Sequence, residues 1–312
     1  MGRAILDRLL LSIPVLIGVL LFGFLLLQLV PGDPARVMAG PTATPEVVEA
    51  IRRDMGLDRP VLVQFWAYLE RMLHGDMGRS LISQKQVTEE LGTAIVPTVE
   101  LMLASLIWSV PLGIGMGTLA AVLRGTVVDR AIMAISVAGV SLPIFFISLL
   151  LIQYLGVYWP LFTFIGRPGP WYTAAGINAL FLPALSLGLI LIGPVARMTR
   201  SSVLEVLKLD HVRTARAKGI SETRVVLKHG LRNALIPVVT LIGLQAGYLL
   251  GGAVVTETIF SWPGVGRLAV GAILSSDFTV AQGAVLLFAL GFITINLIVD
   301  ILYALLDPKV RK

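Results

Sequence analysis

The sequence predicts an all-α integral membrane protein with six transmembrane helices and a small extracytoplasmic cap after the first of them. Only 14% of the 312 residues are charged and 56% are hydrophobic, whereas about a quarter of the residues in a soluble domain are charged. The mean hydropathy is +0.87. The apolar residues gather in six runs, each long enough at about 1.5 Å per residue to cross a hydrocarbon core of about 30 Å. The runs are Leu9–Val30, Thr98–Leu123, Ala131–Val157, Ile177–Val195, Leu235–Thr256 and Ala281–Leu306.

The composition also excludes several kinds of site. The chain has no cysteine, so disulfides, thiol-linked haem and cysteine metal sites are excluded. Its three histidines, His74, His211 and His229, are far apart in sequence and give little support for a metal site. The net charge of +6 raises the alternative of nucleic-acid binding. Basic loops on the cytoplasmic side of a membrane protein explain this charge better.

The first apolar run is predicted to be a transmembrane helix, residues 1–30, followed by the cap, residues 31–94. The run is longer than the 7–15 residues of a usual signal-peptide core, and Pro31-Gly-Asp-Pro34 cannot continue a helix. Within the cap, helices are predicted at Glu46–Met55, ended by Gly56, and at Val61–His74. These amphipathic segments favour a small soluble cap over a linker.

The remaining spans form the transmembrane domain, residues 95–306, followed by a short tail at 307–312. Pro143 predicts a kink in the third span. Gly113 and Gly117, four residues apart, predict a surface on which another helix packs closely. With the N-terminus inside, 16 of the 25 lysines and arginines fall in cytoplasmic segments, and the short outer loops hold two. Both termini are therefore predicted to be cytoplasmic.

The cytoplasmic loop 197–233 holds most of the later charge, and capping residues divide it. Ser202-Val-Leu-Glu205 fits a capping box that opens a short helix. Asp210 is expected to cap the next helix, His211–Lys218, and Gly219 suits a left-handed position at its end. Ser221 is expected to cap a third helix.

The central helix of this loop has two different faces. Val212, Ala215 and Gly219 recur at helical spacing and form a face of small residues. One interpretation is an amphipathic helix lying on anionic headgroups. Because the small face has no Trp, Phe or Leu, a groove in another protein fits it better. The basic side holds Arg213, Arg216 and Lys218.

Four ordered motifs carry a family resemblance along essentially the whole chain. Arg213-Thr-Ala-Arg-Ala-Lys-Gly219, followed by His229–Pro237, resembles the "EAA" loop of bacterial ABC importer permeases. The likeness is greatest to the first (B-type) permease of dipeptide, oligopeptide and glutathione systems, which have the type I importer fold. Arg213 stands where the general motif has Glu, as is usual in peptide permeases. The other motifs are Pro31–Pro34 with Gly56–Pro60, Gly75–Ser80, and Glu257–Leu268.

The resemblance implies that the central helix is a coupling helix in a cleft of an ATP-hydrolysing subunit. It implies as partners a homologous second permease in a heterodimer, two ATP-binding subunits and an extracytoplasmic solute-binding protein, in the bacterial inner membrane with its lipids. ATP and magnesium would be used by the partner subunits, and no cofactor is expected in this chain. The expected coupling residues are Asp210, Arg213, Thr214, Ala215, Arg216, Ala217, Lys218, Gly219 and Ser221.

Motifs of catalysis do not occur in the sequence. It has no Gly-x-x-x-x-Gly-Lys-Ser/Thr loop, so the chain is not expected to hydrolyse ATP. Neither His-Glu-x-x-His nor Gly-x-Ser-x-Gly occurs, so an intramembrane enzyme has little support.

Two further regions are candidates for the transport path. The segment after the fifth span predicts a re-entrant turn or outer gate, or alternatively an interfacial tryptophan anchor. A few polar residues inside spans predict a pathway, or alternatively hydrogen bonds between helices and a hydrated Asp300 near the interface. The gate candidates are Glu257, Phe260, Trp262, Pro263, Gly264 and Gly266, and the pathway candidates are Gln153, Gln245, Asn296 and Asp300.

The predicted function is half of an ATP-driven transmembrane pathway for di- or oligopeptides or glutathione. A nickel-type importer permease would have the same overall organisation, so this alternative is not excluded by the sequence. A secondary transporter is the other alternative, although the charged mid-membrane residues or broken inverted repeats of that class are not evident.

Overall fold

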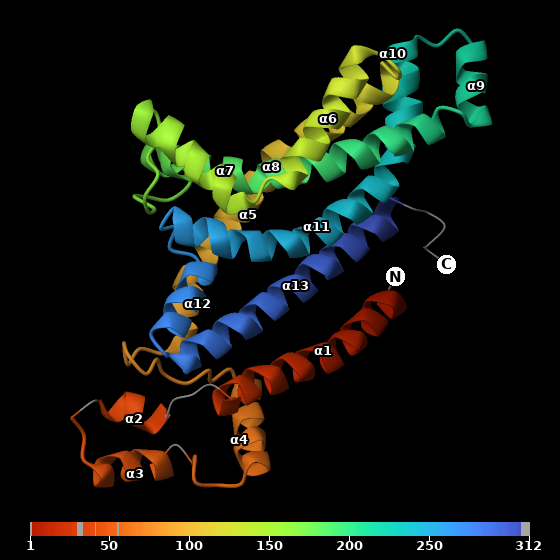
Figure 1. The fold of residues 1–312 in the computed structure, drawn as a ribbon. Helices are drawn as coiled ribbons and strands as arrows, with labels where there is room; N and C mark the ends of the chain where they lie inside the picture. Colours follow the sequence, from red (N-terminus) through yellow and green to blue (C-terminus); the bar gives the residue numbers. More distant parts are fainter. Residues whose placement is uncertain (1, 30–33, 41, 55, 307–312) are drawn as a thin grey trace. The chain divides into compact units, whose positions relative to one another are not determined.

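The computed structural model describes residues 2–29, 34–40, 42–54 and 56–306. These residues are helical apart from turns, loops and one isolated bridge between Arg79 and Gln86. Figure 1 shows the helices coloured in chain order. Two π-helices occur among them: η1 continues α7, and η2 lies between α10 and α11. In chain order the elements are α1 Gly2–Leu29, α2 Pro34–Ala39, α3 Pro45–Asp54, α4 Val61–Leu73, α5 Val87–Val122, α6 Val127–Ser141, α7 Ile144–Leu151, η1 Ile152–Tyr158, α8 Ala174–Val206, α9 Asp210–Ala217, α10 Glu222–Arg224, η2 Val225–Leu231, α11 Arg232–Ile259, α12 Val265–Leu274 and α13 Phe278–Leu306.

The chain divides into two compact units. The first comprises Met1–Ile5, Val99–Trp262 and Thr294–Lys312, and the second comprises Leu6–Thr98 and Pro263–Ile293. Helices α5 and α13 each contribute to both units.

The first unit is built around α8, most of which is buried. Helices α6, α7 and α11 pack against it. The core of this unit includes Leu101 of α5, Leu187 and Leu191 of α8, and Leu249 of α11. Such burial on all sides is typical of a helix at the centre of a bundle.

Close contact between α5 and α8 depends on two glycines. A Cβ on Gly113 would lie 2.9 Å from side-chain atoms of Val195, and one on Gly117 would lie 2.7 Å from the Cβ of Thr199 and closer still to the carbonyl oxygen of Ala196. The predicted packing role of this glycine pair is confirmed.

The third predicted span is broken rather than gently kinked. Helices α6 and α7–η1 meet at 100° across Leu142 and Pro143. Proline has no amide hydrogen and clashes with the preceding turn, so a helix cannot pass through it undisturbed. The position of the predicted kink is confirmed, and the bend is large enough for a broken span or a re-entrant loop.

The second unit joins α1 and α4 to the first turns of α5 and α13 and to α12. Val87 and Leu91 of α5 pack with Val280 and Ala284 of α13. Phe24 of α1 packs with aromatic residues of α4. Among these, Tyr68 is nearly fully buried, and this burial raises the pKa of its hydroxyl to about 12.

Four single helices of the described chain are long and apolar enough to cross a membrane, and the bent pair α6 and α7–η1 makes up to five. The part of α1 with described side chains, Leu10–Leu25, is a shorter apolar helix. The all-helical membrane class is therefore confirmed, whereas the count of six spans stays a prediction. Two of the spanning helices are longer than predicted, because α5 begins at Val87 and α8 continues to Val206.

Inside the predicted cap, α3 and α4 match the predicted helices closely, and Gly56 has a positive φ of 66° as expected for a helix end. Pro34 begins α2, a short helix that was not predicted. The rest of the predicted Pro31–Pro34 stop lies outside the described residues.

Candidate coupling and gating sites

Helix α9 forms where the coupling helix is predicted, with different capping. Leu209 occupies the N-cap position, and Asp210 is the first helical residue. Asp210 therefore does not cap the helix through its side chain, but it lies in the first turn, where a carboxylate interacts favourably with the helix dipole. Gly219 has a φ of 74°, as predicted for the residue after the helix.

The predicted capping box at Ser202–Glu205 is wrong. Helix α8 runs unbroken through it to Val206. The side chains of Ser202 and Val203 are buried, and Val203 packs with Ala121 and Ala234. Tertiary packing therefore continues the helix past a sequence that resembles a helix start. Ser221 does precede α10, but its side chain makes no capping hydrogen bond.

Of the small residues on one face of α9, Val212 and Ala215 are covered by the chain itself, whereas Gly219 is exposed. Val212 is fully buried and Ala215 is 5% exposed. Both pack in a cluster with Val225 of η2 and Ile220 of the intervening loop. This face is therefore unavailable to a partner groove, contrary to the expectation from the sequence.

Polar contacts hold α9 to the elements that follow it. Arg216 donates two hydrogen bonds to the carboxylate of Glu222, at 2.6 and 3.0 Å, and these bonds raise the pKa of its guanidinium. His211 and Asn233 are hydrogen-bonded at 3.3 Å, which joins α9 to α11. Because Arg216 and Glu222 are both substantially exposed, solvent screens this ion pair.

The surface that α9 leaves open to solvent is charged and polar. The side chain of Arg213 is 72% exposed, and its guanidinium lies 3.6 Å from the carboxylate of Asp210. The other exposed residues of the predicted coupling set lie on α9 and in the turn that follows it. They are Thr214, Arg216, Ala217, Lys218, Gly219 and Ser221.

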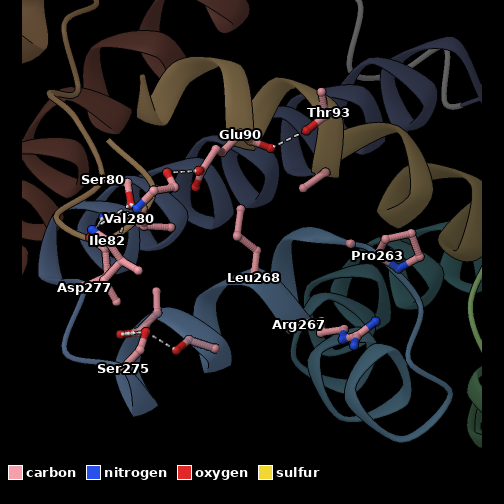
Figure 2. Close-up of a pocket in the computed structure, with 15 residues that line it drawn as sticks. Ser80, Ile82, Glu90, Thr93, Pro263, Arg267, Leu268, Ser275, Asp277 and Val280 are labelled. Carbon is pink, nitrogen blue, oxygen red and sulfur yellow. Dashed lines mark hydrogen bonds between the residues drawn. The ribbon is translucent and has the colours of Figure 1, made fainter. Parts of the chain in front are cut away.

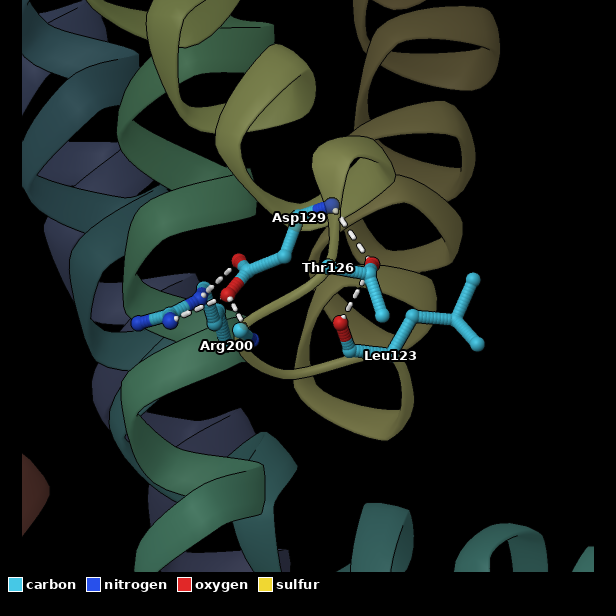
Figure 3. A network of polar contacts seen from close by, with 5 residues as sticks. Leu123, Thr126, Asp129 and Arg200 are labelled. Atoms are coloured by element: carbon cyan, nitrogen blue, oxygen red, sulfur yellow. Dashed lines mark hydrogen bonds and ion pairs between the residues drawn. The ribbon is translucent and has the colours of Figure 1, made fainter.

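A partly buried ion pair that the sequence did not indicate joins α6 to α8 (Figure 3). The Arg200 guanidinium donates to both carboxylate oxygens of Asp129, at 2.6 and 2.8 Å. Asp129 also accepts a hydrogen bond from the backbone of Gly125, and Thr126 caps α6. The sequence around Asp129 indicates only a helix start, with Thr126 as the cap and Asp129 as an acidic residue in the first turn. Nothing in it indicated the arginine as the partner.

The gate candidates fall on both sides of the boundary between the units. In the first unit, Glu257 of α11, Phe260 and Trp262 are all buried. Trp262 belongs to the core around α8, so it cannot act as an exposed interfacial anchor. The Phe260 carbonyl accepts a hydrogen bond from the Gly166 amide at 2.9 Å.

The loop before α8 has a second ion pair of the first unit. Arg167 donates to both carboxylate oxygens of Glu100 of α5, at 2.8 and 2.7 Å. These bonds raise the pKa of Arg167. The loop is thus held to α5 by a bidentate pair and to the end of α11 by the Gly166 amide.

In the second unit, Pro263 and Gly264 line a pocket of about 570 Å³ beside α5 and α12, and Gly266 is buried within α12. Figure 2 shows Glu90 and Thr93 on one side of this pocket and Arg267, Leu268 and Ser275 on the other. The lining of the pocket includes the charged Glu90 and Arg267 and the hydroxyl groups of Ser83 and Thr93 beside several apolar side chains.

Ser80, the last residue of the motif Gly75–Ser80, lines this pocket. The Ser80 hydroxyl donates to Asp277, which also accepts from the backbone amides of Leu81 and Val280. Asp277 thereby caps α13 and fastens the Ser80 loop to it.

Comparison with known families decides the class of the chain. Residues 109–312 match the model of "Binding-protein-dependent transport system inner membrane component", and residues 1–102 match the model of the N-terminal part of such membrane components. The chain belongs to this family of permeases.

Relatives of the permease match it over nearly their full length. It is 47% identical to the glutathione transport system permease protein GsiC of Salmonella typhimurium (strain LT2), over 98% of both chains. Identity to GsiC of Escherichia coli (strain K12) is 46% with the same coverage. The fold resembles a chain of the MetNI methionine ABC transporter in an inward-facing structure, with a TM-score of 0.58 and 20% identity, covering 70% of this permease and 96% of that chain.

The predicted pathway residues of the permease lie on three different helices. Gln153 is exposed on η1, whereas Gln245 of α11 and Asn296 of α13 are half-buried. The side chain of Asp300 lies outside the described residues. A more exposed row on α11, which polarity alone did not reveal, contains Thr240, Leu244 and Tyr248, the last being 77% exposed.

Proposed function

We propose that this permease is one of two membrane subunits of an ATP-driven importer of di- or oligopeptides or glutathione. The observation that carries the proposal is its 47% identity, along 98% of the chain, to permeases of glutathione transport. A nickel-type importer permease is the alternative within the same frame. Family membership disfavours the secondary transporter considered from the sequence.

The proposed topology has six spans, formed by α1, α5, α6–η1, α8, α11 and α13, with both termini in the cytoplasm. The excess of lysine and arginine in the short loops next to α9 supports this orientation. Residues 31–94 would then lie outside the cytoplasm, and the loop 197–233 would face the ATPase subunits.

The proposed coupling surface is the open side of α9. Its inner side, with Val212 and Ala215, is packed on Val225, so a push on the open side reaches η2 and α11 through buried contacts. Arg213, Thr214 and Lys218 are exposed. The rigid connection supports α9 as a lever that transmits movement of an ATPase subunit to the spans.

A second permease subunit is proposed to complete the pathway. Thr240, Leu244 and Tyr248 of α11 lie four residues apart on one helix face and are exposed. A tyrosine that is 77% exposed in the middle of a span suits a polar pathway or a subunit contact better than lipid. This face supports α11 as a lining helix, with Glu257, Phe260 and Trp262 at its gated end.

Transport by the reconstituted complex tests the proposal. The permease is assembled in liposomes with its second permease, ATPase subunits and binding protein. Uptake of labelled glutathione, a dipeptide, an oligopeptide and nickel is then measured with and without ATP. ATP-dependent uptake of glutathione or a peptide is expected. Nickel uptake without peptide uptake would select the alternative.

The variant Ala217→Trp tests the coupling surface in the same assay. A bulky ring on the open side of α9 is expected to block contact with the ATPase subunit and reduce uptake at least tenfold, with loss of ATPase stimulation by the loaded binding protein. The variant Ala217→Ser, which changes size little at the same position, serves as control. Equal uptake by the two variants would show that the open side of α9 does not contact the ATPase subunit during coupling.

A further inference from the structure

Helix α4, in the segment predicted to be a soluble cap, has two adjoining apolar faces. One face packs inside the second unit through Phe65, Tyr68, Leu69 and Met72. The other face is open and holds three large side chains spaced four and seven residues apart, about a quarter turn from the packed face. These are Leu62, Trp66 and Leu73, which are 74%, 65% and 78% exposed.

The polar residues of α4 lie on the remaining side. Gln64, Glu70 and Arg71 project there, and Gln64 donates hydrogen bonds to backbone carbonyls of the preceding turn. The first nine residues of the helix, Val61–Leu69, have no charged side chain. This arrangement of a broad apolar arc with a narrow polar side is typical of a helix that lies in a membrane interface.

The contact with α1 fixes the level of α4 along the first span. Phe24 packs on Phe65 and Tyr68, with ring centroids 5.4 and 5.9 Å apart. Phe24 is five residues before the end of α1 at Leu29, or about 8 Å along the helix axis. An amphipathic interfacial helix lies about 5–10 Å into the boundary of headgroups and acyl chains. The level of α4 therefore matches the outer boundary of the bilayer if α1 spans it.

The end of α1 that contacts α4 also carries exposed apolar side chains. Phe22 and Leu25, close in sequence to Phe24, are 58% and 40% exposed, as expected for a span that faces lipid. Trp66 lies at this level, and tryptophan is enriched where a membrane meets water.

We propose that α4 is an interfacial helix whose Leu62, Trp66 and Leu73 insert into the acyl chains of the outer leaflet. The inference rests on the proposed topology, in which α1 spans the membrane. Lipid is the occupant that fits best, because the face is apolar, lies at the depth of the boundary and belongs to a helix packed on a span with exposed apolar side chains. Helix α4 would thus anchor the cap to the membrane and hold it at a fixed depth relative to the bilayer.

Site-directed spin labelling of the reconstituted transporter tests the proposal. The permease has no cysteine, so Leu62→Cys and Leu73→Cys each introduce a single labelling site at an exposed position. Collision of the nitroxide with oxygen reports acyl chains, and collision with a water-soluble nickel chelate reports solvent. Liposomes of phosphatidylcholine and phosphatidylglycerol are used. At both positions we expect oxygen accessibility to exceed nickel accessibility several-fold.

Two control positions make the outcome decisive. Ala67→Cys lies on the same helix, is exposed and faces the polar side, so the chelate should dominate there. Phe22→Cys reports α1 and should resemble Leu62→Cys. Nickel dominance at Leu62 and Leu73 overturns the inference, as does protection from both reagents, which would indicate a protein partner. Water access at Phe22 would instead overturn the topology, whereas failure of ATP-dependent uptake would affect only the proposed function.

Discussion

At the scale of single residues, Gly117 shows how little space separates α5 from α8. A Cβ there would overlap the carbonyl oxygen of Ala196 and lie 2.7 Å from the Cβ of Thr199. Gly115, two residues earlier on the same helix, has open space around it. The two glycines therefore form a natural pair for a substitution test.

We expect Gly117→Ala to lower the free energy of unfolding by about 1–3 kcal/mol, because overpacking forces the helices apart. Gly115→Ala should leave stability unchanged or raise it by about 0.5–1 kcal/mol through helix propensity. Thermal unfolding of the two purified variants in the same detergent checks the difference. Equal midpoints would contradict the close packing.

The pair of Asp129 and Arg200 offers a second test at this scale. Asp129 is 3% exposed, so removing its partner leaves an uncompensated buried carboxylate. We expect Arg200→Gln to destabilise the permease, and Asp129→Asn combined with Arg200→Gln to cost clearly less than the two single changes added together. Arg197→Gln, an exposed arginine one turn earlier, is the control. Additive effects in this double-mutant cycle would show that the pair does not interact.

At the scale of elements, the sequence predicted where helices occur better than where they end. Long apolar runs fix the spans through hydrophobicity alone. The extension of α5 to Val87 depends on contacts with α13, and the extension of α8 to Val206 depends on buried Val203. Such contacts join residues far apart in sequence, so no local pattern reveals them.

The same limit applies to the candidate coupling site. The spacing of Val212 and Ala215 correctly predicted a face of small residues. It did not show what covers that face, because Val225 reaches it only after the chain turns back. The left-handed conformation of Gly219 was predicted correctly, because it depends only on the local sequence at the end of a helix.

Gly219 therefore supports a prediction about the turn that ends α9. A Cβ at this position would meet no atom within 4 Å, so only backbone strain opposes a side chain. We expect Gly219→Ala to cost about 1–2 kcal/mol and Gly219→Asn to cost less, since asparagine tolerates this conformation. Thermal unfolding of both variants measures the order. If alanine is tolerated as well as asparagine, the left-handed turn is not maintained in the protein.

At the scale of the whole molecule, apolar runs determine the spans, and the distribution of charge predicts their orientation. The excess of basic residues lies in short loops predicted to be cytoplasmic, and short loops determine insertion more strongly than long segments do. Helices α5 and α13 each contribute residues to both units. The proposed orientation is therefore tested once in each unit, at α9 in the first and at Glu89 in the second.

Labelling from one side of the membrane tests this orientation. Lys218→Cys and Glu89→Cys each introduce a single thiol at an exposed position in a chain without cysteine. In intact cells with a permeabilised outer membrane, a membrane-impermeant maleimide should label Glu89→Cys and leave Lys218→Cys unmodified until the inner membrane is disrupted. The reason is that the proposed topology places Glu89 at the extracytoplasmic end of α5, whereas it places α9 among the basic loops retained in the cytoplasm. Labelling of Lys218→Cys in intact cells would reverse the topology, and with it the assignment of α9 to the ATPase side.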